Sequence, residues 1–159
     1  VGIDVAAWKA FPKESPSVFR RLWDGALAVL KAITVHRPRR YFLEVDGQFR
    51  QVRAYSITVA NGSYFSASVA IAPHAVRDDG LLDLCIIPSL SKWMLFFSLP
   101  LIILGKHTLY LRGVRYQKVK RVRIWAEHRA LLRVDGALRL NLPVEIEVLP
   151  RALPIRLPE

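Results

Sequence analysis

Acid–glycine pairs separate short runs of β-forming residues, and this punctuation constrains the fold more than any other feature. Asp46-Gly47 stands between residues 41–45 and residues 49–59, and Asp135-Gly136 follows another apolar run. Asp-Gly between two such runs is a strong signal of a β-hairpin, because both residue types tolerate positive φ. The punctuation therefore predicts a protein built mainly from antiparallel strands.

The remaining β-rich runs are short and evenly distributed along the chain. Further extended segments are predicted at 68–72, 81–87, 114–125, 130–134, 138–140 and 144–148. Two stretches favour helix instead: 16–33, where apolar residues recur every three or four positions, and 91–104, where Pro100 predicts a kink or break. Many short strands with two helices predict a mainly β (α+β) fold, an antiparallel-rich β-sandwich or a barrel.

Size and charge narrow the class of partner. The 159 residues suffice for one domain with a real core, and 24 Lys+Arg against 13 Asp+Glu give a net charge of +11. Such an excess suits nucleic acid, an anionic membrane or a phosphorylated ligand. The basic strands lack the interleaved aromatic residues of RNA-binding sheets, so no nucleic-acid partner is expected. The single cysteine, Cys85, is expected to be a buried strand residue in a reducing compartment.

Aromatic residues in the second predicted helix point to a membrane surface. Trp93, Phe96 and Phe97 lie close in sequence to the basic residues that follow this helix. Apolar and aromatic side chains flanked by cations are typical of proteins that sit peripherally on anionic lipid. This pattern favours a cytoplasmic protein on the inner face of the membrane, and it leaves a homodimer possible.

Three aspartates around Gly80 form the one arrangement that could hold a hard cation. Asp78, Asp79 and Asp83 supply carboxylates, and Gly80 allows a sharp turn that aims main-chain oxygens inward. Asp-Asp-Gly is a common turn, and from spacing alone a plain turn is favoured over a metal site. Asp83 alternates with Leu82 and Leu84 as the solvated side of a strand would. The four dispersed histidines and one cysteine give no zinc spacing, and no nucleophile or phosphate-loop motif is present.

Three blocks in the middle of the chain, taken together, resemble a known family. They are Asn61-Gly62-Ser63-Tyr64, Ile71-Ala72-Pro73-His74-Ala75 and Asp78-Asp79-Gly80-Leu81-Leu82-Asp83. Their order and register resemble the C-terminal domain of the diacylglycerol kinase family, which includes bacterial soluble lipid kinases and sphingosine kinases. The opening Val1-Gly2-Ile3-Asp4 and the late Val134-Asp135-Gly136 look like the two ends of that domain, so the similarity covers essentially the whole chain.

The resemblance implies a two-domain lipid kinase of which residues 1–159 are the C-terminal β-rich domain. An N-terminal domain, absent from this chain, would bind ATP with a Gly-Gly-Asp-Gly-Thr loop, and the active site would lie between the domains. Phosphoryl transfer to a membrane lipid hydroxyl would use Mg²⁺ and ATP. Carried over by position, the family's Mg²⁺ site falls on the Asp79 carboxylate and on the main-chain oxygens of Val76 and Leu81.

Two departures from the family pattern bear on activity. The general-base Glu of the family falls at Ala137, which cannot accept a proton, and Asp135 is the nearest acid before it. The three glycines that follow the family's Tyr are here Ser66-Ala67-Ser68. Loss of a positioned base typically costs about 10²–10⁴ in rate. The alternative function is therefore a weakened or inactive lipid-binding homologue. The identity of the lipid stays open.

Overall fold

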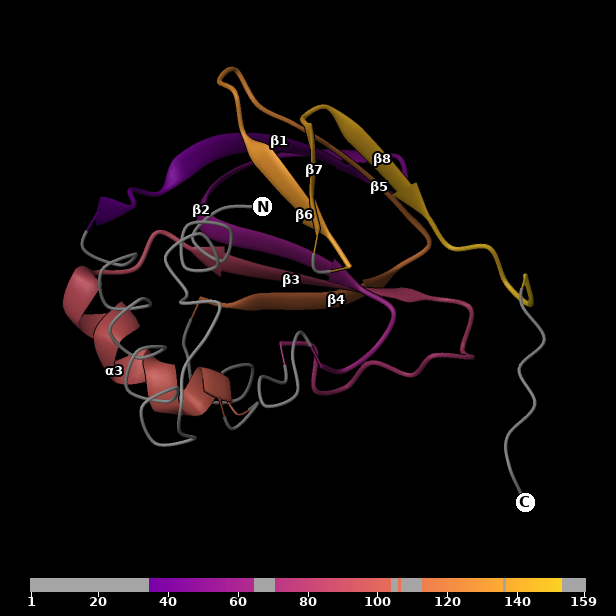
Figure 1. The fold of residues 1–159 in the computed structure, drawn as a ribbon, viewed down its shortest axis with the longest axis horizontal. Coiled ribbons are helices and arrows are strands. Elements are labelled where there is room, and N and C mark those ends of the chain that lie inside the picture. The colour runs from indigo at the N-terminus through magenta and orange to yellow at the C-terminus, as the bar shows by residue number, and fades with distance from the viewer. Residues whose placement is uncertain (1–34, 65–70, 104–105, 107–112, 136, 153–159) are drawn as a thin grey trace.

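The computed structural model describes residues 35–64, 71–103, 106, 113–135 and 137–152 (Figure 1). Eight strands and one helix lie within these residues: β1 (Arg39–Val45), β2 (Gln48–Ala60), β3 (Leu82–Pro88), α3 (Lys92–Ile103), β4 (Arg115–Val119), β5 (Arg121–Trp125), β6 (Leu131–Val134), β7 (Ala137–Asn141) and β8 (Val144–Glu147).

Six of the strands form one antiparallel sheet in the order β4-β3-β2-β1-β5-β8. The first hairpin turns at Asp46-Gly47, as the sequence predicts, with Val45 paired to Gln48. Both turn residues have positive φ, 47° for Asp46 and 80° for Gly47. The Asp46 carboxylate accepts the N–H groups of Lys120 and Arg121 at 3.0 and 2.9 Å. This turn therefore also fixes the place where β4 leads into β5.

A single residue, Lys120, joins β4 to β5, although three strands separate them in the sheet order. The sheet must therefore curl until its β4 edge approaches β5, and Figure 1 shows β1, β5 and β8 arching over β3 and β4. Strands that bend at such a corner pass from one layer of a β-sandwich to the other. The N–H of Val148 also bonds to the Lys120 carbonyl at 3.1 Å, which ties β8 to the same corner.

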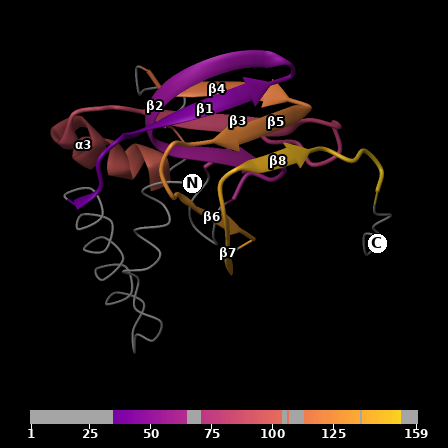
Figure 2. The same ribbon diagram turned by 90° about the horizontal axis from the view of Figure 1, so that it is seen from above.

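The main core fills the inside of this curl. It is built from alternate residues of the sheet strands, which is the period-2 pattern of a half-buried strand. The hairpin β6–β7 covers the inside face, where Ala130 and Leu132 pack against these residues. Figure 2 shows the hairpin on that side of the sheet. The buried strand residues are Tyr41, Leu43, Val45, Val52, Ala54, Ile57, Leu82, Leu84, Ile86, Val119, Val122 and Ile124.

Helix α3 packs on the outside of the sheet, against a second and smaller cluster. Leu95 is 2% exposed and contacts Tyr55 of β2 and Ile87 of β3. Ser91 caps the helix, because its hydroxyl accepts the Met94 N–H at 3.1 Å. The helix runs through Pro100 to Ile103, so of the predicted kink or break at Pro100 the break is wrong, and the kink stays a prediction. A proline removes one helical hydrogen bond, and the preceding and following turns maintain the helix around it.

Apart from the one at 68–72, the predicted strands are confirmed with small shifts, and the predicted mainly β, sandwich-like fold is confirmed with them. The 114–125 run divides at Lys120 into two strands. The predicted helix at 16–33 and most of the predicted strand at 68–72 lie outside the described residues, while Ile71 and Ala72 belong to a bend. Cys85 is buried as predicted, and burial raises the pKa of its thiol to about 12. Within the described part of the chain, no helix is long and apolar enough to cross a membrane.

Candidate functional site

The three sequence blocks come together beside the outer face of β3 and β4. The turn after β2 is joined to the segment before β3 by a hydrogen bond from the Ala72 N–H to the Ser63 carbonyl, 3.2 Å long. The Ser63 hydroxyl donates to the Ala75 carbonyl, also at 3.2 Å. A Cβ on Gly62 would lie 3.3 Å from Nε of Arg77, so these segments approach closely at a residue without a side chain. Blocks that are six and two residues apart in the sequence thus form one local structure.

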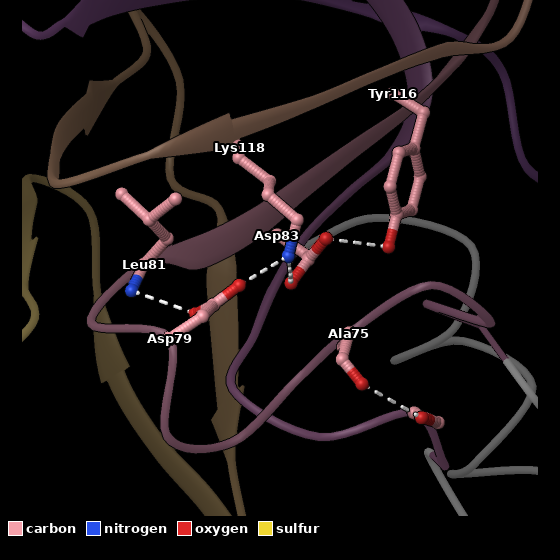
Figure 3. Close-up of polar contacts among 7 residues, drawn as sticks. Ala75, Asp79, Leu81, Asp83, Tyr116 and Lys118 are labelled. Atoms are coloured by element: carbon pink, nitrogen blue, oxygen red, sulfur yellow. Dashed lines mark hydrogen bonds and ion pairs between the residues drawn. The ribbon is translucent and has the colours of Figure 1, made fainter.

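Asp79 uses both carboxylate oxygens within this structure (Figure 3). Its Oδ1 accepts the Leu81 N–H at 2.9 Å, and Gly80 between them has a φ of 72°. Its Oδ2 accepts a hydrogen bond from Nζ of Lys118 at 2.5 Å. The Lys118 ammonium, and then the Leu81 N–H, hold the pKa of Asp79 below its usual range. The same pairing raises the pKa of Lys118.

Asp83 lies next to this pair and is fully buried, with no exposed surface. Its Oδ1 accepts the hydroxyl hydrogen of Tyr116 at 2.6 Å, and its Oδ2 lies 3.7 Å from Nζ of Lys118. This Oδ2 has no hydrogen-bond partner within the described structure. Burial, followed by the hydrogen bond to Asp83, raises the pKa of Tyr116. Asp83 is thus a buried anion whose nearby cation is the ammonium that also binds Asp79.

Strand pairing explains why Asp83, Tyr116 and Lys118 meet beside the Asp79 turn. Asp83 lies directly opposite Lys118, and Cys85 lies opposite Tyr116, in the antiparallel register of β3 and β4. Side chains two residues apart on a strand share a face. Asp83, Tyr116 and Lys118 therefore project on the outer face, opposite the core that contains Leu82, Leu84 and Val119.

The structure corrects one expectation and leaves others as predictions. Asp83 is expected from the sequence on a solvated strand face and is instead completely buried, because both faces of β3 are covered. Asp78 is exposed, and the Val76 side chain is 47% exposed. Leu81 contributes its N–H to Asp79, and the predicted roles of the Val76 and Leu81 main-chain oxygens stay predictions.

The predicted catalytic position lies elsewhere on the fold. Asp135 ends the β6 side of the β6–β7 turn with a φ of 44°, and Ala137 begins β7, paired with Val134. This hairpin packs on the inside face of the sheet through Ala130 and Leu132. The structure therefore does not bring Asp135 together with the Asp79 cluster on the sheet face that carries Lys118. Its catalytic role stays a prediction.

Lys118 and Tyr116 are the site residues that sequence reasoning misses. Lys118 falls among the basic residues of a strand that looks solvated, and no sequence pattern assigns a role to Tyr116. No pattern within the strand could have found them, because Arg115-Tyr116-Gln117-Lys118 are all polar. The pairing with β3 is what sets Tyr116 and Lys118 on the face of Asp83. Neither strand specifies that pairing by itself.

The arrangement does not fit a Mg²⁺ at Asp79 while Lys118 remains in place. Mg²⁺ requires near-octahedral oxygen coordination at close range, and an ammonium already occupies the approach to Oδ2. Asp79 and Asp83 are the two carboxylates at this point, and among the described residues no group of three His, Cys, Asp or Glu side chains is placed to hold a metal ion.

A second surface feature lies on α3. Trp93 and Phe97 are 75% and 70% exposed, and Met94 and Phe96 are also exposed on this helix. Leu95 and Ser98 are the buried side chains among the described residues of the same helix, each with 2% exposure or less. Helix α3 thus packs on the sheet through few of its side chains and exposes its aromatic residues to solvent. This exposed apolar surface is available to contact a membrane or another molecule.

The fold and the clustered blocks define a class, the β-sandwich-like C-terminal domain of a lipid-kinase-like protein. Residues 2–157 match the family described as the YegS C-terminal NAD kinase beta sandwich-like domain, and the chain belongs to this family. The resemblance inferred from the sequence blocks is thereby confirmed.

Individual relatives agree with this assignment. The chain is 29% identical over 103 residues to a Xanthomonas euvesicatoria protein named "Probable lipid kinase YegS-like", covering 65% of this chain and 33% of that protein. It is 29% identical over 133 residues to a Mycobacterium tuberculosis diacylglycerol kinase, covering 83% and 42%. A crystal structure of a diacylglycerol kinase from Bacillus anthracis shares the fold with a TM-score of 0.61 at 23% identity, covering 79% and 43%. The chain thus spans less than half the length of these relatives.

Proposed function

We propose that this chain is the C-terminal domain of a lipid kinase that transfers a phosphoryl group from ATP to a lipid hydroxyl at a membrane surface. The observation that carries the proposal is the family match over residues 2–157, with relatives named as lipid and diacylglycerol kinases. The chain corresponds to 33% and 42% of those relatives. An N-terminal domain of the same protein would therefore supply the ATP site, with the reaction in the cleft between the two domains.

Mg²⁺ enters this proposal as the companion of ATP. Phosphoryl transfer depends on positioning the nucleophile in line and on neutralising charge that develops on the transferred group. A metal ion carried by the nucleotide supplies that neutralisation. The C-terminal domain would contribute the lipid-facing half of the cleft. The hydrogen bonds that join the turn after β2 to the segment before β3 would keep this half rigid.

The exposed aromatic residues of α3 support a membrane role. Trp93 and Phe97 are largely exposed, and Lys92 and Lys106 are exposed basic residues at the two ends of this region. Tryptophan and phenylalanine partition into the headgroup region, while lysines gain from anionic lipid. We propose that this helix faces the inner leaflet from the cytoplasmic side.

Activity is tested on the full-length protein with labelled ATP, MgCl₂ and mixed vesicles that contain diacylglycerol, other lipid alcohols or none. The expected product is a phosphorylated lipid that appears only with a lipid alcohol present. Chromatography of the extracted lipid identifies the substrate. ATP hydrolysis without any lipid product, over the whole lipid panel, would contradict the proposal.

Membrane contact is tested by vesicle sedimentation of Trp93→Ser and Phe97→Ser variants. Each should weaken binding to anionic vesicles several-fold, and binding should also weaken with salt because part of the attraction is electrostatic. Phe49→Ser is the matched control, since Phe49 is 63% exposed but lies on the sheet, where it stacks on Phe42 and packs at a tilt against Trp125. Equal loss in all three variants would remove α3 from the proposal.

A second candidate function follows from Ala137. If the protein is a lipid-binding homologue without catalysis, the parent protein should bind vesicles and yield no product. Ala137→Glu, which restores the acid that the resemblance places there, should then produce activity from a silent parent. An active parent that is unchanged or impaired by Ala137→Glu would exclude the inactive alternative.

A further inference from the structure

We propose that the Lys118 ammonium is a built-in cation for the Asp79 turn, so that this turn is held without a bound divalent ion. The observation behind it is the convergence of two carboxylates on one Nζ atom. Asp79 Oδ2 lies 2.5 Å from it and Asp83 Oδ2 lies 3.7 Å from it (Figure 3). The proposal concerns how the domain is held together and does not depend on its being a kinase.

Asp83 creates the demand for a cation at this place. It is fully buried, and a buried carboxylate is costly unless charge or hydrogen bonds compensate it. Tyr116 satisfies Oδ1, while Oδ2 makes no hydrogen bond within the described structure and faces the ammonium across 3.7 Å. Among the described residues, the positive charge of Lys118 is therefore what stabilises the buried Oδ2 of Asp83.

Lys118 is suited to the role by its position and its chemistry. It lies directly across from Asp83 in the β3–β4 ladder, so the sheet itself delivers the ammonium. An ammonium is a compact charge with three donors, and the side chain is 36% exposed, which leaves water access for the donor not aimed at a carboxylate. Asp79 then links this charge to the turn by accepting the Leu81 N–H with its other oxygen.

A divalent ion and Lys118 would compete for the same oxygen. Asp79 Oδ1 already accepts the Leu81 N–H, so Oδ2 is the oxygen that a metal would approach most readily, and Oδ2 already accepts the Lys118 ammonium. Binding a metal would require the ammonium to move away from Asp79, and Asp83 Oδ2 would then lose its nearby cation. The tethered cation has the advantage that it is always present at the site, whereas a free ion must be recruited from solution.

The test measures binding of Mn²⁺ alone, by electron paramagnetic resonance, to the full-length protein without nucleotide. The wild type and Asp79→Asn should bind the same amount of Mn²⁺, because no ion is held at Asp79 while Lys118 is there. Lys118→Met removes the ammonium and keeps most of the apolar stem. It should gain a Mn²⁺ site that the double variant Lys118→Met/Asp79→Asn loses again.

Matched variants and a stability measurement complete the test. Asp78→Asn and Lys120→Met change neighbouring exposed residues and should leave Mn²⁺ binding unchanged. In EDTA, Lys118→Met should melt roughly 3–6 °C below the wild type, with partial recovery in MgCl₂. The wild type should melt at the same temperature in either solution.

Two results would overturn the proposal. One is Mn²⁺ binding by the wild type that Asp79→Asn abolishes, which would mean that a metal displaces Lys118; this comparison stands even if Lys118→Met fails to fold. The other is a folded Lys118→Met that binds no more Mn²⁺ than the wild type. In that case the two carboxylates would not form a cation position at all.

Discussion

Two acid–glycine turns look alike in the sequence and do different work in the fold. Asp46-Gly47 and Asp79-Gly80 both place an aspartate before a glycine with positive φ, 80° and 72°. The Asp46 carboxylate accepts two main-chain N–H groups, from Lys120 and Arg121. The Asp79 carboxylate accepts one main-chain N–H and one lysine ammonium.

The difference comes from what lies nearby. Asp46 stands at the corner where β4 turns into β5, and main-chain donors of that corner point at its carboxylate. Asp79 stands beside β3, where a second carboxylate is buried and needs a cation. The same dipeptide is therefore a structural clamp in one place and part of a charge cluster in the other. Each of the following substitutions tests one part of this contrast.

Asp83→Ala should have the largest effect. It removes the buried acceptor of Tyr116 and leaves the Lys118 charge without one of its two carboxylates. We expect the free energy of unfolding to fall by about 3 kcal/mol, measured by urea denaturation. Tyr116→Phe should cost about 1 kcal/mol, and the exposed Asp78→Ala should be nearly neutral. A loss at Asp83 no larger than that at Asp78 would refute a buried charge cluster.

Asp46→Ala should have the next largest effect. It removes the acceptor of two main-chain N–H groups at the β4–β5 corner, and we expect a loss of about 1–2 kcal/mol in the same measurement. Asp46→Asn keeps a side-chain oxygen and tolerates the φ of 47°, so it should recover most of this loss. If Asn proves as costly as Ala, charge rather than hydrogen bonding holds this turn.

The two glycines should respond alike. An alanine Cβ at Gly47 would meet nothing within 4 Å, and one at Gly80 would meet Pro150 at 3.9 Å, which is an ordinary contact. Each substitution should therefore cost only the strain of positive φ, about 1–2 kcal/mol. A much larger loss at Gly80 would show that the two turns differ in their backbones and not only in their acids.

The smallest effect should appear in the acid titration of Asp79. Its pKa is lowered from 3.8, first by the hydrogen bond from Lys118. A lowered folded-state pKa means that Asp79 stabilises the fold above its unfolded-state pKa, and that this contribution is lost as pH falls through the folded-state pKa. Carboxyl NMR should place the titration below 3.8, and Lys118→Met should move it upward. An unchanged midpoint in the variant would separate Asp79 from Lys118.

Much of the fold could be predicted because its signals are local. Asp46-Gly47 and Asp135-Gly136 place the hairpins, and the alternating runs give the strands on either side with small errors at their ends. The helix at Lys92–Ile103 follows from the helical preference of 91–104. Pro100 does not end this helix, so the break that was one of two expected outcomes there does not occur.

The candidate site could be predicted only in part. Asp79 and Gly80 stand out in the sequence, and the three blocks around them indicate the family. The burial of Asp83 could not be predicted from the sequence, because alternation along a strand does not reveal whether the second face of the strand is covered. The same limit concealed Lys118, which looks like any other basic residue of a strand that alternates polar and apolar side chains.

The sequence by itself determined the turns, the strand pattern, the positive charge and the family, because each depends on residues close together in the chain or on a recognisable order of blocks. The tertiary structure decided which strands pair. Only the antiparallel register of β3 with β4 sets Lys118 opposite Asp83, thirty-five positions earlier in the chain. That register depends on how the whole sheet curls around its core, and so no local stretch of sequence could assign a cation to Asp79.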